Sequence, residues 1–313
     1  MSMRPHFVMS VTTFAANGEI DEEQFRLWLR QFVDLRLGVY VGSGGNGEGH
    51  ALLPDELRRV YEIAVDELQG KVRVHANLPE EHTARQTIAQ ARIAAAAGVE
   101  MVHLYTLEDR HGMKPTDHEL ITYYDDVLAE IEMPACIAIN PTVGRVPSPA
   151  VVAEIVGRHD NIRAIRLSHQ PEAYLIELRD RIERNIEYYY QFNTGALGPL
   201  ALGASLFSAE GNIVPRTLSQ FIDLYEAGNY QEAAIAMAHI RRAFNYCKGF
   251  GSGPRWMKMA IRGLKRPGWQ GEPRRPYLMP SEAEQKTFMD GLLKLRVPEI
   301  DEYAHAAGLV LPK

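Results

Sequence analysis

Eight short apolar runs, each followed by a stretch with helical periodicity, occupy the chain from residue 6 to residue 227. A short apolar run bounded by turn residues indicates a buried strand, and apolar residues three and four apart indicate a helix. Strands that alternate with helices form parallel sheets with right-handed crossovers. Eight such units suit a closed barrel. The sequence therefore predicts an α/β fold, a (β/α)8 TIM barrel, with a doubly wound open sheet as the alternative.

The expected strands and helices divide the chain into two parts. The eight strands are expected at residues 6–14, 38–42, 72–78, 101–107, 135–140, 162–168, 187–193 and 206–209. From residue 230 onward the pattern is helical, with helices expected at 231–246, 255–264, 281–295 and 299–307 and a connector rich in Pro and Gly at 266–280. We therefore expect a barrel over residues 1–228 and a C-terminal helical extension, packed on the barrel, over residues 229–313.

Composition and charge exclude several classes of partner. The net charge is -6 and Lys and Arg are scattered without a basic run, which does not fit a nucleic-acid-binding surface. No apolar stretch approaches the roughly 20 residues that span a bilayer, and the N-terminus lacks the build of a signal peptide. The two cysteines, Cys136 and Cys247, are far apart, as expected of reduced thiols. We expect a cytoplasmic protein without nucleic-acid or membrane partners.

A glycine-rich loop follows the second expected strand. Residues 42–49 read GSGGNGEG, with five glycines in eight positions. Glycine tolerates positive φ, so backbone N–H groups of such a loop can turn toward an anion. Because sites of (β/α)8 barrels form at the carboxyl ends of the strands, Gly45, Asn46 and Gly47 are candidate ligand-binding residues. A merely flexible loop is the alternative, and no Gly-Lys-Ser/Thr follows to make a phosphate P-loop.

The sixth expected strand carries a cation, Arg166, where a buried position would be apolar. Residues two apart on a strand face the same way, so Arg166 shares a face with Ala164 and Ser168. Two interpretations stay open. Arg166 pairs with a carboxylate such as Glu48 or Glu210, or it holds the carboxylate of a ligand through two hydrogen bonds. In both cases the guanidinium stays charged, so it cannot serve as an amine nucleophile.

Other polar residues at expected strand ends offer weaker possibilities. His75, His103 and His169 form a conceivable metal cluster, although their spacing matches no recognised ligand pattern. No nucleophile elbow accompanies a serine, so a Ser-His-Asp triad is not indicated. We expect no metal and no cofactor.

Motifs spread over nearly the whole length resemble the dihydrodipicolinate synthase / N-acetylneuraminate lyase family. Each motif is weak alone, but their order along the chain is specific for the fold and the superfamily. They are Val-Thr-Thr-Phe at 11–14 with Gly18, Ile20 and Asp21; Gly47-Glu48 with Leu53-Pro54 and Glu56; the alanines before Gly98; Met133-Pro134 and Asn140-Pro141; and Gly203-Ala204 with Asn212 and Pro215. The resemblance implies a (β/α)8 barrel with a C-terminal helical bundle, commonly assembled into tetramers built from dimers.

The resemblance also implies a mechanism whose key residues are absent here. The family forms a Schiff base between a strand-six lysine and pyruvate or another 2-keto acid, relays protons through a strand-five tyrosine, and binds the carboxylate with a Thr-Thr pair. The matching positions are Arg166 for the lysine, Ala138 or Ile139 for the tyrosine, and Gly45-Asn46 for the threonines. Residues 105–108 replace the family's Pro-Tyr-Tyr element, and Arg145 corresponds, with changed spacing, to an arginine after strand five.

We therefore expect a lyase or aldolase-family protein with altered chemistry that acts on a small keto-acid or sugar-acid carboxylate. The candidate catalytic residues are Arg166, Glu48, Tyr105 and His103, and the candidate substrate-binding residues are Gly45, Asn46, Gly47, Asn140, Arg145, Ser168 and Ser208. A non-catalytic ligand-binding or regulatory barrel is the alternative, and a metal-dependent lyase is a more distant one. A homo-oligomer, dimer or tetramer, is expected from the resemblance and from apolar residues such as Phe244, Trp256, Met257 and Met259.

Overall fold

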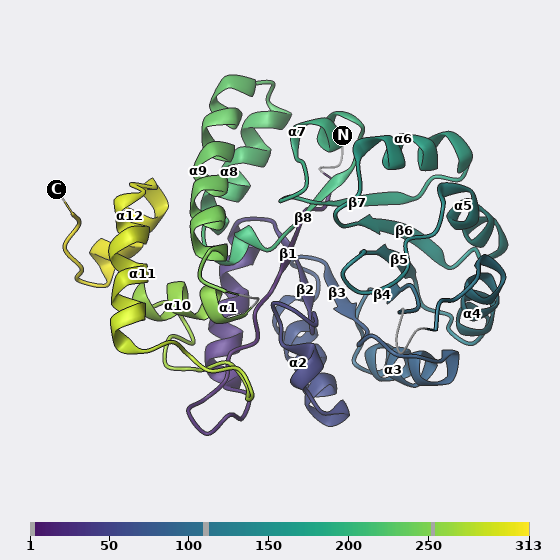
Figure 1. Cartoon of the computed structure of the whole chain (residues 1–313), viewed down its shortest axis with the longest axis horizontal. Coiled ribbons are helices and arrows are strands. Elements are labelled where there is room, and N and C mark those ends of the chain that lie inside the picture. The colour runs from purple at the N-terminus through teal and green to yellow at the C-terminus, as the bar shows by residue number, and fades with distance from the viewer. Residues whose placement is uncertain (1–3, 109–112, 252–253, 313) are drawn as a thin grey trace.

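A computed structural model describes residues 4–108, 113–251 and 254–312 and contains a closed barrel of eight parallel strands (Figure 1). Each strand pairs with its sequence neighbours, and β1 pairs with β8 to close the barrel. The predicted barrel is confirmed, and the open sheet is wrong. The strands are β1 Phe7–Met9, β2 Gly38–Val41, β3 Val74–Asn77, β4 Met101–Tyr105, β5 Ala135–Ile139, β6 Ile162–Leu167, β7 Glu187–Gln191 and β8 Ser205–Ser208.

Helices connect successive strands and continue after the barrel. The connecting helices are α1 Glu22–Asp34, α2 Pro54–Leu68, α3 Ala84–Ala96, α4 Asp117–Ala129, α5 Pro149–Arg158, α6 Glu172–Arg181, α7 Leu197–Ala201 and α8 Pro215–Glu226, with short 3-10 helices η1 Gly49–Ala51 and η2 Glu210–Asn212. The last four are α9 Tyr230–Lys248, α10 Pro254–Gly263, α11 Glu282–Lys294 and α12 Pro298–Ala306. Figure 1 shows α10, α11 and α12 gathered on one side of the barrel, beyond α9 and α1.

Local chemistry explains where these elements begin and end. The expected cap Asp21 starts α1, and its carboxylate accepts a hydrogen bond from the Gln24 N–H at 3.1 Å. Strand β1 is shorter than expected. The chain leaves the sheet after Met9, and the N–H of Val11 donates to the side chain of Asn212 at 3.2 Å.

Alternating residues of each strand face either the helices or the barrel interior. The interior holds an aromatic and small-residue cluster made of Phe7, Tyr40, Met101, Cys136, Ala164, Tyr189 and Phe207. The residues between them, such as Val39, Val102 and Ile165, join the larger core that packs against the helices. The predicted common face of Ala164 and Arg166 agrees with this pattern.

The C-terminal helices are tied to the barrel by apolar packing and a buried carboxylate. Phe244 of α9 meets Trp256 of α10 edge-on, with ring centroids 5.4 Å apart. The carboxylate of Glu299 in α12 accepts hydrogen bonds from the N–H groups of Arg216 and Thr217, at the start of α8. The boundary at residue 228 stays a prediction.

The apolar residues that suggested an oligomer are accounted for within one chain. Phe244, Trp256, Met257 and Met259 are all buried in the single subunit. They therefore give no argument for a further subunit, and the expectation of an oligomer rests on the family resemblance alone. Among residues 4–108, 113–251 and 254–312, no helix is long and apolar enough to cross a membrane.

Candidate functional site

A cavity of about 490 Å³ lies at the carboxyl ends of the barrel strands and is here called the mouth cavity. Strand ends, the glycine-rich loop and the helices α9 and α10 all contribute to its wall. Its lining residues are Met9, Ser43, Gly45, Asn46, Glu80, Tyr105, Asn140, Thr142, Val143, His169, Gln191, Asn193, Ala209, Phe244, Lys248, Gly251 and Trp256. Four of the residues predicted from the sequence, Gly45, Asn46, Tyr105 and Asn140, are therefore brought together here.

Arg166 lies inside the barrel, is only 2% exposed and does not line the mouth cavity. Its guanidinium carbon lies 4.8 Å from the ring centroid of Tyr40, 5.0 Å from that of Tyr105 and 5.1 Å from that of Phe207. A cation near aromatic faces is attracted by their quadrupoles. Tyr105 both contacts the guanidinium and lines the mouth cavity, so it connects the buried charge to the site.

The hydrogen-bonding capacity of Arg166 is only partly used. Its Nε and Nη1 atoms are buried and have no hydrogen-bond partner among the described residues. No described carboxylate forms an ion pair with it, so the predicted pairing with Glu48 or Glu210 is wrong. Buried charges are normally paired, because removing a charge from water is costly. Two unpaired N–H groups on a buried cation therefore mark this position as a candidate anion site.

Glu48 pairs with residues other than Arg166, and these contacts support the glycine-rich loop. Its carboxylate, fully buried, forms an ion pair with Lys258 of α10 and accepts a hydrogen bond from the Arg274 N–H at 2.7 Å. The backbone of Glu48 has φ of 54°, in the left-handed region, so the loop is held in a specific conformation. A carboxylate fixed by Lys258 and Arg274 is poorly placed to move protons in the mouth cavity, so this geometry does not support the catalytic role of Glu48, which stays a prediction.

His103 is likewise sealed in the barrel interior. Its Nε2 atom lies 3.1 Å from Nδ1 of His75, and its ring packs against Tyr40 with centroids 4.7 Å apart. Burial, followed by the charge of Arg166, holds the pKa of His103 well below its usual range. The imidazole is therefore neutral and does not line the mouth cavity, which removes it as the expected proton carrier there.

Several predicted binding residues have other partners. Arg145 donates to the Pro115 carbonyl at 2.7 Å and pairs with Asp117, which fastens the start of α4. The Ser208 hydroxyl donates to Glu210 Oε2 at 2.9 Å. Ser168 is buried directly after the end of β6, and neither serine lines the mouth cavity. The contacts of Arg145 and Ser208 support the surrounding structure, and the binding roles of Arg145, Ser168 and Ser208 stay predictions.

The glycine-rich loop offers backbone donors to the mouth cavity. Gly47 does not line the mouth cavity, and its N–H donates to Ser43 Oγ at 2.9 Å, so its binding role stays a prediction that this cavity does not support. The N–H groups of Gly45 and Asn46 have no acceptor among the described residues, and a Cβ built on Gly45 would meet no atom within 4 Å. These two amides are therefore candidate donors for an oxyanion.

Sequence reasoning missed the wall that the last helices contribute. Lys248, Phe244 and Trp256 lie far along the chain from every strand, and their helical pattern gave no sign that they reach the site. His169 was considered only as a metal ligand, yet it lines the mouth cavity. In the described residues, no group of three or more His, Cys, Asp or Glu side chains is arranged to hold a metal ion.

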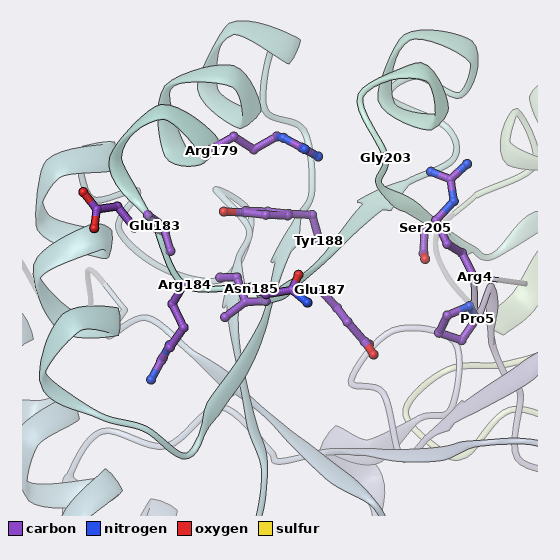
Figure 2. Close-up of a pocket in the computed structure, with 12 residues that line it drawn as sticks. Arg4, Pro5, Arg179, Glu183, Arg184, Asn185, Glu187, Tyr188, Gly203 and Ser205 are labelled. Carbon is purple, nitrogen blue, oxygen red and sulfur yellow. The ribbon is translucent and has the colours of Figure 1, made fainter. Parts of the chain in front are cut away.

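A second hollow, of about 550 Å³, opens near the start of β7 and β8. Figure 2 shows Arg179 lying over the ring of Tyr188, with Arg4 and Arg184 on either side. These arginines already donate to backbone carbonyls, those of Leu200, Leu202 and Ile162 among them. The hollow is therefore a poor anion site despite its three cations.

Comparison with known proteins fits this geometry. The family model described as "Dihydrodipicolinate synthetase family" matches residues 3–295. The chain belongs to this family. A 4-hydroxy-tetrahydrodipicolinate synthase from Xanthomonas campestris is 27% identical over 294 residues, covering 93% of this chain and 94% of that protein. A DapA-like lyase from Rhizobium meliloti, described as uncharacterized, is 24% identical over 93% of this chain and 95% of its own length.

Solved structures of the family share the fold. The dihydrodipicolinate synthase of Aquifex aeolicus superposes with a TM-score of 0.82 at 20% identity, covering 95% of this chain and 99% of that one. A prophage protein of the family from E. coli K12, solved in complex with pyruvate, gives a TM-score of 0.81 at 19% identity over 94% and 99% of the two chains. At these identities the likeness establishes the barrel and its C-terminal helices as the family fold.

Proposed function

We propose that this member of the dihydrodipicolinate synthetase family acts as a lyase or aldolase on a small keto-acid or sugar-acid carboxylate without forming a Schiff base. Arg166 takes the place of the family's lysine on β6, and β6 contains no lysine at any position. A guanidinium does not condense with a ketone as an amine does, because it stays protonated. The ligand is therefore held by charge and hydrogen bonds only.

The observation that carries this proposal is the pair of unpaired N–H groups on Arg166. Nε and Nη1 lie on different edges of the planar guanidinium, so each offers a separate charge-assisted hydrogen bond to an anion oxygen. Tyr105 contacts the guanidinium of Arg166 and also lines the mouth cavity, so the proposed ligand lies beside Tyr105. The cost of burying the charge is offset when an anion arrives.

The same arrangement suits an enolate intermediate. In a retro-aldol step the electrons of the breaking C–C bond move to the carbonyl oxygen of the keto acid, and a nearby cation stabilises the charge that develops. The open N–H groups of Gly45 and Asn46 are further donors for that oxygen. The proton that leaves the substrate hydroxyl, and the one that returns to carbon, pass through the Tyr105 phenol in this proposal, since Tyr105 lines the cavity and contacts Arg166.

A non-catalytic binding protein is the second candidate, and one observation favours it. The two other proton carriers predicted from the sequence are unsuited, because Glu48 is paired with Lys258 and His103 is buried and neutral. A barrel that retains an anion site and loses its acid–base groups would bind without turnover. Carboxylate binding with no product from any keto acid or sugar acid would favour this candidate over the enzyme.

The test combines trapping with binding. Purified protein is incubated with pyruvate and borohydride and its intact mass is measured, and no added mass is expected. Thermal shift is then measured with pyruvate and related acids, for the wild type and for Arg166→Met. A stabilisation that disappears in the variant supports the proposal. A reduced covalent adduct, or equal shifts in both proteins, would refute it.

Location and assembly complete the proposal. We infer a cytoplasmic protein from the composition and from the two buried free cysteines, Cys136 and Cys247. A homo-oligomer, dimer or tetramer, is proposed by analogy with the family. Light scattering across a range of concentrations tests this, and a strict monomer would contradict it.

A further inference from the structure

The wall of the mouth cavity carries one full positive charge among its described lining residues, the ammonium of Lys248. Lys248 is the last residue of α9, about 80 residues after Arg166 in the sequence. The chain as a whole is acidic, with a net charge of -6, so a cation at the site is not a reflection of overall composition. Arg166 lies inside the barrel and Lys248 on the cavity wall, which gives the site two separate cations, while Glu80 is the carboxylate among the lining residues.

The position of Lys248 is fixed by well-anchored elements. Arg241, in the same helix, donates to the carbonyls of Phe192 and Asn193 at 2.7 and 2.6 Å, which ties α9 to the end of β7. The Lys248 ammonium lies 5.9 Å from the ring centroid of Phe244, which is itself buried against Trp256. The backbone from which the Lys248 side chain projects is therefore fixed by packed elements.

His169 adds a second polar group to the same part of the wall. Its backbone φ of 55° is left-handed, and its N–H donates to Thr194 Oγ1 at 3.1 Å, so the residue is held in place. His169 and Lys248 both line the mouth cavity, and burial, followed by the charge of Lys248, lowers the pKa of His169. At neutral pH the imidazole is uncharged and is available as a hydrogen-bond donor beside the ammonium.

A lysine at the end of a helix also stabilises the helix dipole. That role, however, needs only proximity to the last turn and does not require the side chain to line a cavity. The mouth cavity, at about 490 Å³, is in the range that accommodates drug-sized ligands and exceeds what a three-carbon acid fills. The cavity therefore has room for a larger ligand, whose end farthest from Arg166 can pair with Lys248.

We propose that Lys248, with His169, binds a second carboxylate, so that the ligand is a 2-keto dicarboxylate rather than a monoacid. The inference rests on the proposed function, which places the keto-acid carboxylate at Arg166. The second carboxylate pairs with the Lys248 ammonium and accepts a hydrogen bond from His169. Because Lys248 is exposed, the attraction is partly screened and weakens as salt rises.

The experiment compares ligands matched in chain length. Dissociation constants are measured by calorimetry for oxaloacetate, 2-oxoglutarate and 2-oxoadipate, and for the monoacids 2-oxobutyrate, 2-oxopentanoate and 2-oxohexanoate. The wild type is expected to prefer at least one diacid over its matched monoacid by five- to tenfold. Lys248→Met is expected to abolish this preference and to leave the monoacids within twofold of the wild type.

Lys294→Met is the matched control. Lys294 is exposed and is also the last residue of its helix, α11, so its loss removes the same dipole interaction away from the mouth cavity. The diacid preference should be unchanged in this variant. A wild type that binds keto acids without preferring any diacid, or a preference that survives Lys248→Met, overturns this inference alone. Failure of every acid to bind overturns the proposed function as well.

Discussion

Arg166→Met separates a ligand-binding role from a structural one. Methionine has a similar length and no charge, so it fills the same space in the barrel interior. The variant loses three contacts between the cation and the rings of Tyr40, Tyr105 and Phe207, each worth roughly 0.5–2 kcal/mol. It also removes a buried charge with two unpaired N–H groups, a penalty on the order of several kcal/mol.

These opposing terms predict little net loss of stability in the ligand-free protein. We expect the free energy of unfolding of Arg166→Met to lie within about 1.5 kcal/mol of the wild type, or above it, since the two contributions nearly cancel. Binding of a keto acid should weaken by about 1.5–3 kcal/mol, the scale of hydrogen bonds to a charged group. Urea unfolding and calorimetry measure the two quantities.

Arg73→Met provides the control. Arg73 is also partly buried in the barrel, but its guanidinium pairs with Glu187 at 2.8 Å, so its loss should reduce stability and leave ligand binding unchanged. The reasoning is refuted if Arg166→Met destabilises the protein by more than about 3 kcal/mol while binding stays intact, because Arg166 would then be a structural cation.

Three further outcomes are expected. Lys258→Met leaves the buried carboxylate of Glu48 without its ion pair, so the free energy of unfolding measured in urea should fall by about 3–5 kcal/mol. The double variant with Glu48→Gln should recover part of that loss. Cys136 and Cys247 are buried, and burial raises the pKa of each thiol. Ellman's reagent should therefore label neither thiol in the native protein. Rapid labelling without denaturant would contradict this. Burial lowers the pKa of His6 to about 3 and those of His75 and His103 well below the usual range. The unfolded state then binds more protons below pH 6.5, so stability is complete above that pH and falls as pH decreases, each histidine adding up to about 1.4 kcal/mol per pH unit. A urea midpoint that is unchanged between pH 7 and pH 5 would argue against neutral buried histidines.

The barrel was predictable because periodicity is a local property. Each strand and each helix shows its own spacing of apolar residues, and the eightfold alternation leaves few topologies open. The residues of the site that follow directly from a strand, Gly45, Asn46, Tyr105 and Asn140, were found for the same reason.

The errors concern side chains whose partners lie far along the sequence. Glu48 was assigned to the site because it ends the glycine-rich loop, but its partners Lys258 and Arg274 are more than 200 residues away. Lys248 was missed because nothing in a helix sequence indicates which strand ends it will approach. Of the two interpretations of Arg166, pairing with Glu48 or Glu210 was the wrong one, and the three aromatic rings that surround the guanidinium come from three different strands.

The link from Glu48 to Lys258 and Arg274 has a consequence for how the protein is made. The glycine-rich loop is synthesised early, but the groups that fix its conformation are the Lys258 ammonium and the backbone N–H of Arg274. Arg274 also donates to the carbonyl of Gly18 at 2.9 Å and pairs with Glu56, so one late residue fastens three early segments. A ribosome-bound chain that ends before this point can complete all eight strands and still lack a formed anion site. Ligand binding by nascent chains of increasing length should therefore begin only after residue 274 has emerged, well after the barrel itself can close.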